Sequence, residues 1–368
     1  MEHSALATEV AWSAFALAFV FGAAANHSSF CTMGAVSDVV NIGAWTRMRM
    51  WLFAIAMAIL GAQGMHLAGL VDLSKSIYVT PNFTWLSYLV GGFLFGVGMT
   101  LASGCGSKTL VRIGGGSLKA VVVLAFLAIS SYMTLKGLFA AWRVSGLESS
   151  AIALSSGQDL PSLIHAATGI DAATARMLLA ATIAAILIAF AFAGKEFRAF
   201  DNWFAALLIG LTIAGGWYVS GKLGYLAEDP NTLQEAFVAT NSGKLESFSF
   251  VAPVGYSLEL LMLWSDKSKI VTLGIAGVIG IIAGSFAYAM ATKTFRLEGF
   301  RETGDLINHI AGAILMGFGG VAALGCTIGQ GITGFSTLAL GSILAFFAII
   351  AGAAATMKFQ YWQISRAA

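Results

Sequence analysis

The chain has 368 residues, of which 58% are hydrophobic and only 10% are charged, and its formal net charge is +2. So few charged residues could not cover the surface of a water-soluble protein of this size, and the small net charge argues against a nucleic-acid partner. Apolar runs of about 20 residues recur along the whole chain, as in polytopic membrane proteins.

The sequence predicts an all-α membrane protein with nine spanning helices. In chain order they cover residues 8–25, 50–70, 85–103, 117–140, 174–194, 202–220, 270–291, 305–324 and 336–357. The first run is interpreted as a membrane helix rather than a signal peptide, because further spans follow it and no small-residue cleavage site is seen.

Four apolar, glycine-rich segments are too short to cross a hydrocarbon core about 30 Å thick. They are residues 27–41, 104–114, 247–260 and 325–335. We expect them to be re-entrant half-helices, which are tolerated at membrane depth where protein or a cavity satisfies their backbone. The longer segments 143–172 and 224–246 contain Ser, Gly, Asp and Glu and are expected to be extracytoplasmic loops.

The distribution of Lys and Arg predicts an extracytoplasmic N-terminus and a cytoplasmic C-terminus, because cytoplasmic ends of spans are enriched in these residues. With that orientation, the cytoplasmic side carries Arg47, Arg49, Lys108, Arg112, Lys119, Lys195, Arg198, Lys293, Arg296, Arg301, Lys358 and Arg366. The opposite side carries fewer, including Lys75, Arg143, Lys222, Lys244, Lys267 and Lys269.

The dipeptide Gly-Cys occurs twice, within a longer internal repeat. The two copies align without a gap over six identical residues. Those of the first copy are Gly91, Gly96, Gly98, Ala102, Gly104 and Cys105, and they align in that order with Gly312, Gly317, Gly319, Ala323, Gly325 and Cys326. Equivalent spans are five apart, so the halves should run antiparallel, as in transporters with inverted repeats. We therefore expect one repeat at 1–141, a loop and connecting span at 142–198, and the second repeat at 199–368.

All three cysteines lie at the predicted helix breaks: Cys31, Cys105 and Cys326. An odd number of cysteines, with no CxxC motif among them, argues against a disulfide framework and against a zinc site built from cysteines. Ser28 and Ser29 are expected to cap the half-helix that carries Cys31. Its counterpart in the second half, residues 249–255, has no cysteine. Near the positive end of a helix a thiol can hydrogen-bond to a sulfur-bearing anion or act as a nucleophile, although a lone buried cysteine is also an ordinary small hydrophobe.

Other residues near the breaks are candidates for the same path. Gly104 and Gly325 would let a solute approach the backbone closely. Lys108, at membrane depth, either meets an anion or extends to the cytoplasmic surface. His27 could attract an anion, and Gln330 could line a pore, although each could equally make internal hydrogen bonds. We find no Walker A motif, HExxH or nucleophile–His–Asp arrangement, so the sequence predicts neither an enzyme nor a cofactor.

These motifs resemble the YeeE/YedE family of bacterial membrane proteins, a sulfur-transport family that includes thiosulfate importers. The resemblance covers essentially the whole chain. It rests on Ser29-Phe30-Cys31 with Gly34, on Gly104-Cys105 with Arg112, and on residues 325–331, GCTIGQG. It implies an hourglass-shaped inner-membrane permease with inverted repeats, in which thiosulfate passes the three cysteines through S–H···S contacts. It also implies, for some members, a small cytoplasmic TusA-like sulfurtransferase as partner. Two halves of one chain can enclose a path in the lipid bilayer, which permits a monomer.

Two departures from the family pattern add positive charge at the first Gly-Cys break. Lys108 stands where a small residue is expected, and Gly114-Gly115-Gly116 replaces a glycine–acid–glycine turn. The added positive charge is therefore also compatible with sulfite, another sulfur oxyanion or a selenium species as the substrate. A membrane sulfurtransferase that forms a cysteine persulfide, a disulfide oxidoreductase and a soft-metal transporter are the alternatives from other classes.

Overall fold

The computed structural model describes residues 2–230, 232–300 and 302–367, so Arg301 lies outside the described residues. Within these ranges, nine helical segments are long and apolar enough to cross a membrane, which confirms the predicted all-α membrane fold. The long helices are α1 (Glu2–His27), α3 (Thr46–Leu67), α4 (Trp85–Leu101), α6 (Leu118–Lys136), α9 (Ala172–Phe192), α10 (Phe200–Tyr218), α12 (Leu273–Ala291), α13 (Thr303–Ala322) and α14 (Leu340–Ala367).

Short helical elements occupy each of the four segments predicted to be broken. They are α2 (Thr32–Ser37) with η1 (Asp38–Ile42), α5 (Gly106–Gly114), α11 (Ala252–Met262) and η7 (Gly329–Gly334). The remaining short helical elements are η2 (Leu73–Lys75), α7 (Leu138–Trp142), η3 (Arg143–Leu147), η4 (Glu148–Ser150), α8 (Leu160–Thr168), η5 (Glu196–Arg198) and η6 (Val219–Leu223).

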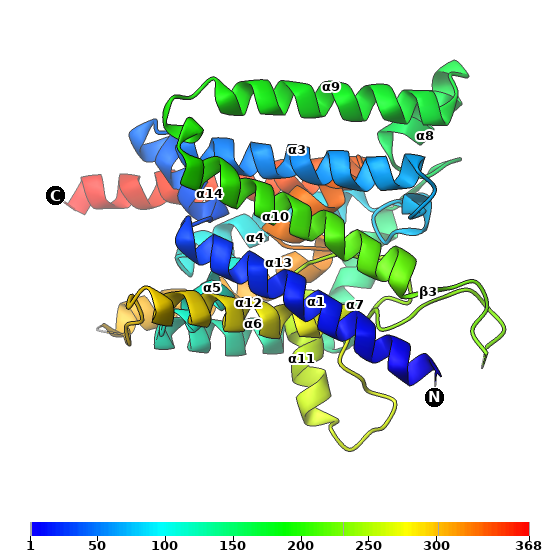
Figure 1. Cartoon of the computed structure of the whole chain (residues 1–368). Coiled ribbons are helices and arrows are strands. Elements are labelled where there is room, and N and C mark those ends of the chain that lie inside the picture. Colours follow the sequence, from blue (N-terminus) through cyan, green and yellow to red (C-terminus); the bar gives the residue numbers. More distant parts are fainter. Residues whose placement is uncertain (1, 231, 301, 368) are drawn as a thin grey trace.

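The segments expected to be plain loops contain some regular structure. Antiparallel pairs join β1 (Asn82–Phe83) to β2 (Ile152–Ala153) and β3 (Tyr225–Leu226) to β4 (Ala236–Phe237). Residues 143–172 also contain α8, where the Pro161 at the helix start and Gly169 at its end are typical boundary residues. These elements gather with the N-terminus at one end of the long helices, and the C-terminus lies at the other end (Figure 1).

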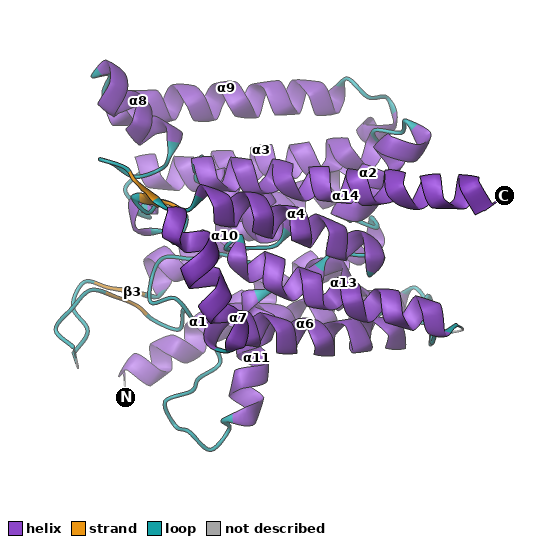
Figure 2. Cartoon of the chain, turned by 180° about the vertical axis from the view of Figure 1, so that it is seen from behind, coloured by secondary structure: helices purple, strands orange, loops and turns teal. Residues whose placement is uncertain are grey.

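The long helices run side by side, with α9 on the outside of the bundle (Figures 1 and 2). α1 packs along α12, and α3 packs along α10. α4 packs against α14, and α6 packs against α13, while α4 and α13 also cross each other. The core is therefore built between helices far apart in the sequence, and two of the short elements pack against it: α5 contacts α12, and η7 contacts α3.

Glycines allow the crossing of α4 and α13. A Cβ atom added to Gly319 would lie 2.5 Å from the carbonyl oxygen of Gly91, and one added to Gly98 would lie 2.6 Å from that of Gly312. Real Cβ atoms do not come this close to other atoms, so a residue with a side chain would not fit at these positions. The two backbones are therefore in direct contact, as small residues allow between membrane helices.

We expect Gly319→Ala to destabilise the protein by about 1–3 kcal/mol, because the added methyl group would force the two helices apart. Gly64→Ala is the matched control, since Gly64 is an exposed helical glycine with nothing within 4 Å of an added Cβ. That control should be neutral or slightly stabilising. Thermal unfolding of both variants in detergent measures the difference, and equal unfolding temperatures would contradict the close crossing.

Candidate functional site

The same backbone turn precedes each of the three cysteines. The residue two positions earlier is left-handed without being glycine: Ser29 (φ 51°), Ser103 (φ 55°) and Leu324 (φ 58°). At each break the next N–H bonds back to a carbonyl five residues upstream, at 3.1 Å for Phe30–Ala25, 2.9 Å for Gly104–Met99 and 2.7 Å for Gly325–Gly320. These are Schellman-type helix ends. Each one ends an incoming helix, and the cysteine begins the next segment.

The cysteines themselves, and not the preceding serines, occupy the starts of those segments. Cys31 is the N-cap of α2, and its sulfur accepts a hydrogen bond from the Gly34 N–H at 3.4 Å. The expected capping by Ser28 and Ser29 is therefore wrong: Ser28 donates to the Ala24 carbonyl at 2.8 Å, and Ser29 forms the left-handed turn. A serine that caps a helix has an extended backbone, whereas the backbone of Ser29 is left-handed.

The other two thiols make similar contacts. Cys105 is the N-cap of α5, and its sulfur lies 3.3 Å from the Ser107 hydroxyl oxygen. Cys326 accepts a hydrogen bond from the Gly329 N–H at 3.4 Å. All three are free thiols, with exposed fractions of 6%, 0% and 0% for Cys31, Cys105 and Cys326.

The structure brings the three cysteines into one region. The side chains of Cys31 and Cys105 lie close enough to interact with each other, and Thr327 also interacts with the Cys105 side chain. Cys326, next to Thr327, interacts electrostatically with Cys105. The fold therefore assembles a buried cluster of soft, polarizable sulfur atoms from segments that follow α1, α4 and α13.

A cavity of about 150 Å³ lies near Cys326 at the end of the bundle that holds the N-terminus. Its lining includes Arg143, Glu246, Ser249 and Tyr256. Arg143 bonds to Glu148, and burial raises the pKa of Glu246, although hydrogen bonds from Asn241 and Ser242 oppose that shift. The cavity is therefore small, and its lining is uncharged except for Arg143 and Glu246.

A second cavity, of about 280 Å³, has a basic lining. It includes Lys108, Arg112 and Arg296, together with Glu298, which lies 3.9 Å from Arg112. Lys108 is half-buried, and its stem packs against Gly104, whose added Cβ would lie 3.3 Å from it. Because three cations face one carboxylate, this cavity suits an anion.

The remaining predicted residues lie in different surroundings. His27 is exposed, with its ring nitrogens 2.7 Å from the Tyr288 hydroxyl and 3.4 Å from an Asp201 carboxylate oxygen, so it faces those groups rather than a thiol. Gln330 is buried, and its amide nitrogen bonds to the Ala323 carbonyl. Gly325 lies against Gln330, where an added Cβ would be 3.2 Å from its side chain.

A family model for sulphur transport matches residues 27–355. The chain belongs to the sulphur transport family. The thiosulfate transporter TsuA of Spirochaeta thermophila is 26% identical over 353 residues, covering 93% of this chain and 96% of the relative. TsuA of Escherichia coli is 26% identical over 328 residues, covering 85% and 84%. These matches confirm the predicted family and a transport function rather than an enzymatic one.

The sequence did not predict the buried hydroxyl groups that lie near the cysteines of this transport protein. Thr32 follows Cys31 as Thr327 follows Cys326, and neither threonine hydroxyl satisfies hydrogen-bond geometry with a partner among the described residues. The same holds for Tyr78 and Ser249. The repeated Cys-Thr pair was a usable signal, whereas Tyr78 lies far from any cysteine in the sequence and gave none.

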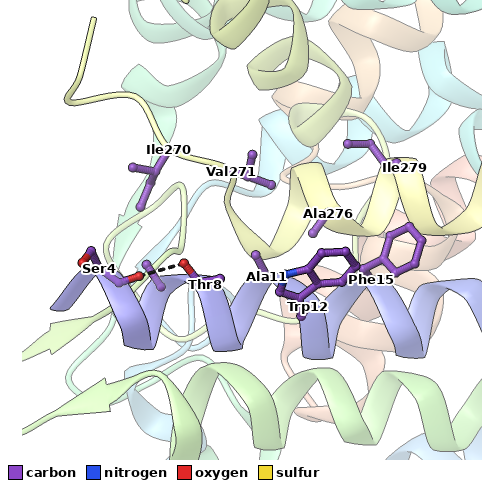
Figure 3. A pocket seen from close by; sticks show the side chains of 10 residues that line it. Ser4, Thr8, Ala11, Trp12, Phe15, Ile270, Val271, Ala276 and Ile279 are labelled. Carbon is purple, nitrogen blue, oxygen red and sulfur yellow. Dashed lines mark hydrogen bonds between the residues drawn. The ribbon is translucent and has the colours of Figure 1, made fainter. Parts of the chain in front are cut away.

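An apolar groove of the transport protein lies away from the cysteines. It has a volume of about 570 Å³ and lies between the start of α1 and the start of α12. Figure 3 shows Trp12 and Phe15 of α1 facing Val271 and Ile279. Its lining has no charged residue, so this groove suits hydrocarbon and not an anion.

Proposed function

We propose that this protein is a bacterial inner-membrane permease that imports thiosulfate or a closely related sulfur-containing anion. The observation that carries the proposal is the cluster of three buried free thiols, in which Cys105 interacts with both Cys31 and Cys326. The two relatives named as thiosulfate transporters support the choice of anion. A thiol is suited to a substrate with a polarizable terminal sulfur, because both partners are soft.

The three cysteines would hand the terminal sulfur along by transient hydrogen bonds, without lasting covalent change. In this sequence of contacts Cys326 is met first from outside, and Cys105 with Cys31 is met next. The basic cavity that contains Lys108 and Arg112 would then receive the anion at the cytoplasmic end. His27, Gln330, Gly104 and Gly325 belong to the proposed path as groups around its two ends.

We also propose that the path lies between inverted repeats, residues 1–141 and 199–368, joined by 142–198, with the short helices re-entrant. The helix contacts support this relation: α1–α12 corresponds to α3–α10, and α4–α14 corresponds to α6–α13. The reciprocal glycine contacts between α4 and α13 follow the same exchange of halves. Such a two-fold arrangement would give an hourglass with the thiols at its centre.

The proposed orientation has the N-terminus outside and the C-terminus in the cytoplasm, within membrane lipid. A single chain would suffice, because both halves of the path are in it. A small TusA-like sulfurtransferase that accepts sulfur near the basic cytoplasmic cavity is the proposed partner.

Growth on thiosulfate tests the proposal. A bacterium without its own sulfate and thiosulfate uptake would carry this gene, with cysteine, sulfite and thiosulfate offered as separate sulfur sources. We expect growth on thiosulfate only when the gene is present. To remove any need for a partner, uptake of ³⁵S-thiosulfate into liposomes with the purified protein is measured in parallel. No uptake in either system, with the protein verified in the membrane, would reject thiosulfate and direct the assay to sulfite and selenium anions.

The cluster of thiols also favours a second function, a sulfurtransferase in which the Cys105 sulfur attacks the terminal sulfur of thiosulfate, the sulfur–sulfur bond of thiosulfate breaks, and sulfite leaves with a persulfide on Cys105. Intact-mass measurement after exposure to thiosulfate separates the two functions. We expect the mass to stay unchanged, and a stable gain of one sulfur atom on Cys105 would favour the sulfurtransferase.

A further inference from the structure

Two buried hydroxyl groups lie close to Gly329, whose N–H donates to the Cys326 sulfur. Tyr78, in the segment between η2 and β1, is 1% exposed, and the Ser249 hydroxyl oxygen, in the extended segment before α11, is fully covered. Within the part of the chain that the structure describes, neither hydroxyl has a hydrogen-bond partner. Burying a hydroxyl without a partner is costly, so such groups in a native protein call for an explanation, and an absent ligand is one.

Gly329 shows how close these groups are to the thiol. Its N–H donates to the Cys326 sulfur at 3.4 Å. A Cβ atom added to Gly329 would lie 2.5 Å from the Ser249 hydroxyl oxygen and 3.5 Å from the Tyr78 hydroxyl oxygen. The two hydroxyls and the residue that holds the thiol therefore surround one small region.

The cavity of about 150 Å³ borders this region, because Ser249 is part of its lining. Burial raises the pKa of Tyr78 well above its ordinary value, with a further contribution from Cys326, so its hydroxyl keeps its proton and can donate. Serine can donate as well. Both donors are neutral, so they can hold an anion without pairing it with a fixed charge from which release would be slow.

We propose that the Tyr78 and Ser249 hydroxyls form an oxygen-binding subsite beside Cys326. They donate hydrogen bonds to the oxygen atoms of a sulfur oxyanion while its other end faces the thiol. The inference rests on the proposed function and deepens it. Thiosulfate has a soft sulfur end and a hard oxygen end, and this subsite reads the oxygen end, so it selects sulfur oxyanions over sulfur species that have no oxygen.

Binding of ³⁵S-thiosulfate to the purified protein in detergent tests the subsite with Tyr78→Phe and Ser249→Ala. Each variant should weaken binding by about 10- to 100-fold, the loss expected for one hydrogen bond to a charged group. The unfolding temperature without thiosulfate should stay equal or rise, because the removed hydroxyls have no partner to lose. A merely structural role for these hydroxyls would lower it.

Tyr88→Phe is the control, since Tyr88 is equally buried but its hydroxyl accepts a bond from Gln158 at 3.3 Å. It should keep the wild-type affinity. Wild-type affinity in both Tyr78→Phe and Ser249→Ala would overturn the subsite. If the wild-type protein binds no thiosulfate, the proposed substrate fails instead, and the same variants are then compared with ³⁵S-sulfite, where unchanged binding would again overturn the subsite.

Discussion

Alanine in place of Cys105 or Cys326 is expected to abolish thiosulfate uptake while the protein still folds. Both side chains are fully buried, and both lie just after the left-handed turn that ends a helix. Alanine keeps the turn, because the turn is made by the residues before the cysteine, but it removes the soft sulfur that the substrate would meet. The measurement is the initial rate of ³⁵S-thiosulfate uptake into liposomes.

Three comparisons separate loss of the thiol from loss of structure. Met316→Leu, in α13, removes a buried sulfur that is not a thiol, and should transport normally. Cys105→Ser and Cys326→Ser keep a small hydrogen-bonding group but not a soft one, and should transport poorly. Thermal unfolding in detergent checks that each variant is folded. Normal uptake in either alanine variant would refute a relay through the thiols.

The apolar runs were sufficient to predict the nine long helices, because a segment that spans a bilayer must be both long and apolar. The positions of the breaks were predictable from four apolar, glycine-rich segments that are too short to span a bilayer, but the backbone geometry of the breaks was not. Helices that end in a left-handed turn usually have glycine there, and Ser29, Ser103 and Leu324 are not glycine. The tertiary structure supplies what the local sequence does not signal.

The candidate site was predictable in its cysteines but not in its contacts. The proximity of Cys31 to Cys105 depends on how two separate breaks are brought together, which the periodicity of the sequence does not report. The hydroxyl of Tyr78 approaches Gly329 from a loop with no motif. Neutral side chains that become important only through burial leave no pattern in composition or spacing.

Asparagine in place of Asp159 should destabilise the protein by about 3–5 kcal/mol, the cost of leaving a buried charge without its partner. Asp159 precedes α8 and Arg176 lies in α9, with side chains 1% and 6% exposed and an N–O distance of 2.9 Å. Arg176 also donates to the Gln63 side chain at 2.9 Å. The asparagine amide could still accept a hydrogen bond from Arg176, but it could not balance the guanidinium charge.

The comparison variant is Glu235→Gln, which removes an exposed ion pair with Lys75 and should cost no more than about 1 kcal/mol. Replacing both partners, Asp159→Leu with Arg176→Met, should recover most of the lost stability, because apolar groups of similar size remove the uncompensated charge. Thermal unfolding in detergent measures all three. Asp159→Asn as stable as Glu235→Gln would show that the pair is not buried in the way described.

The hydrogen bonds that join Asp159, Arg176 and Gln63 also connect the destabilisation by Asp159→Asn to transport. Gln63 donates to the Ser336 carbonyl at 2.6 Å, and Trp217 donates to the Ser336 hydroxyl at 3.0 Å. Ser336 lies two residues after the end of η7, so the charge pair of Asp159 and Arg176 is connected through Gln63 to the segment that begins with Cys326. We therefore expect Asp159→Asn to slow uptake in proportion to its effect on stability, and the double apolar variant to restore both together. Uptake that stays low while stability recovers would mean that the charges themselves act in transport.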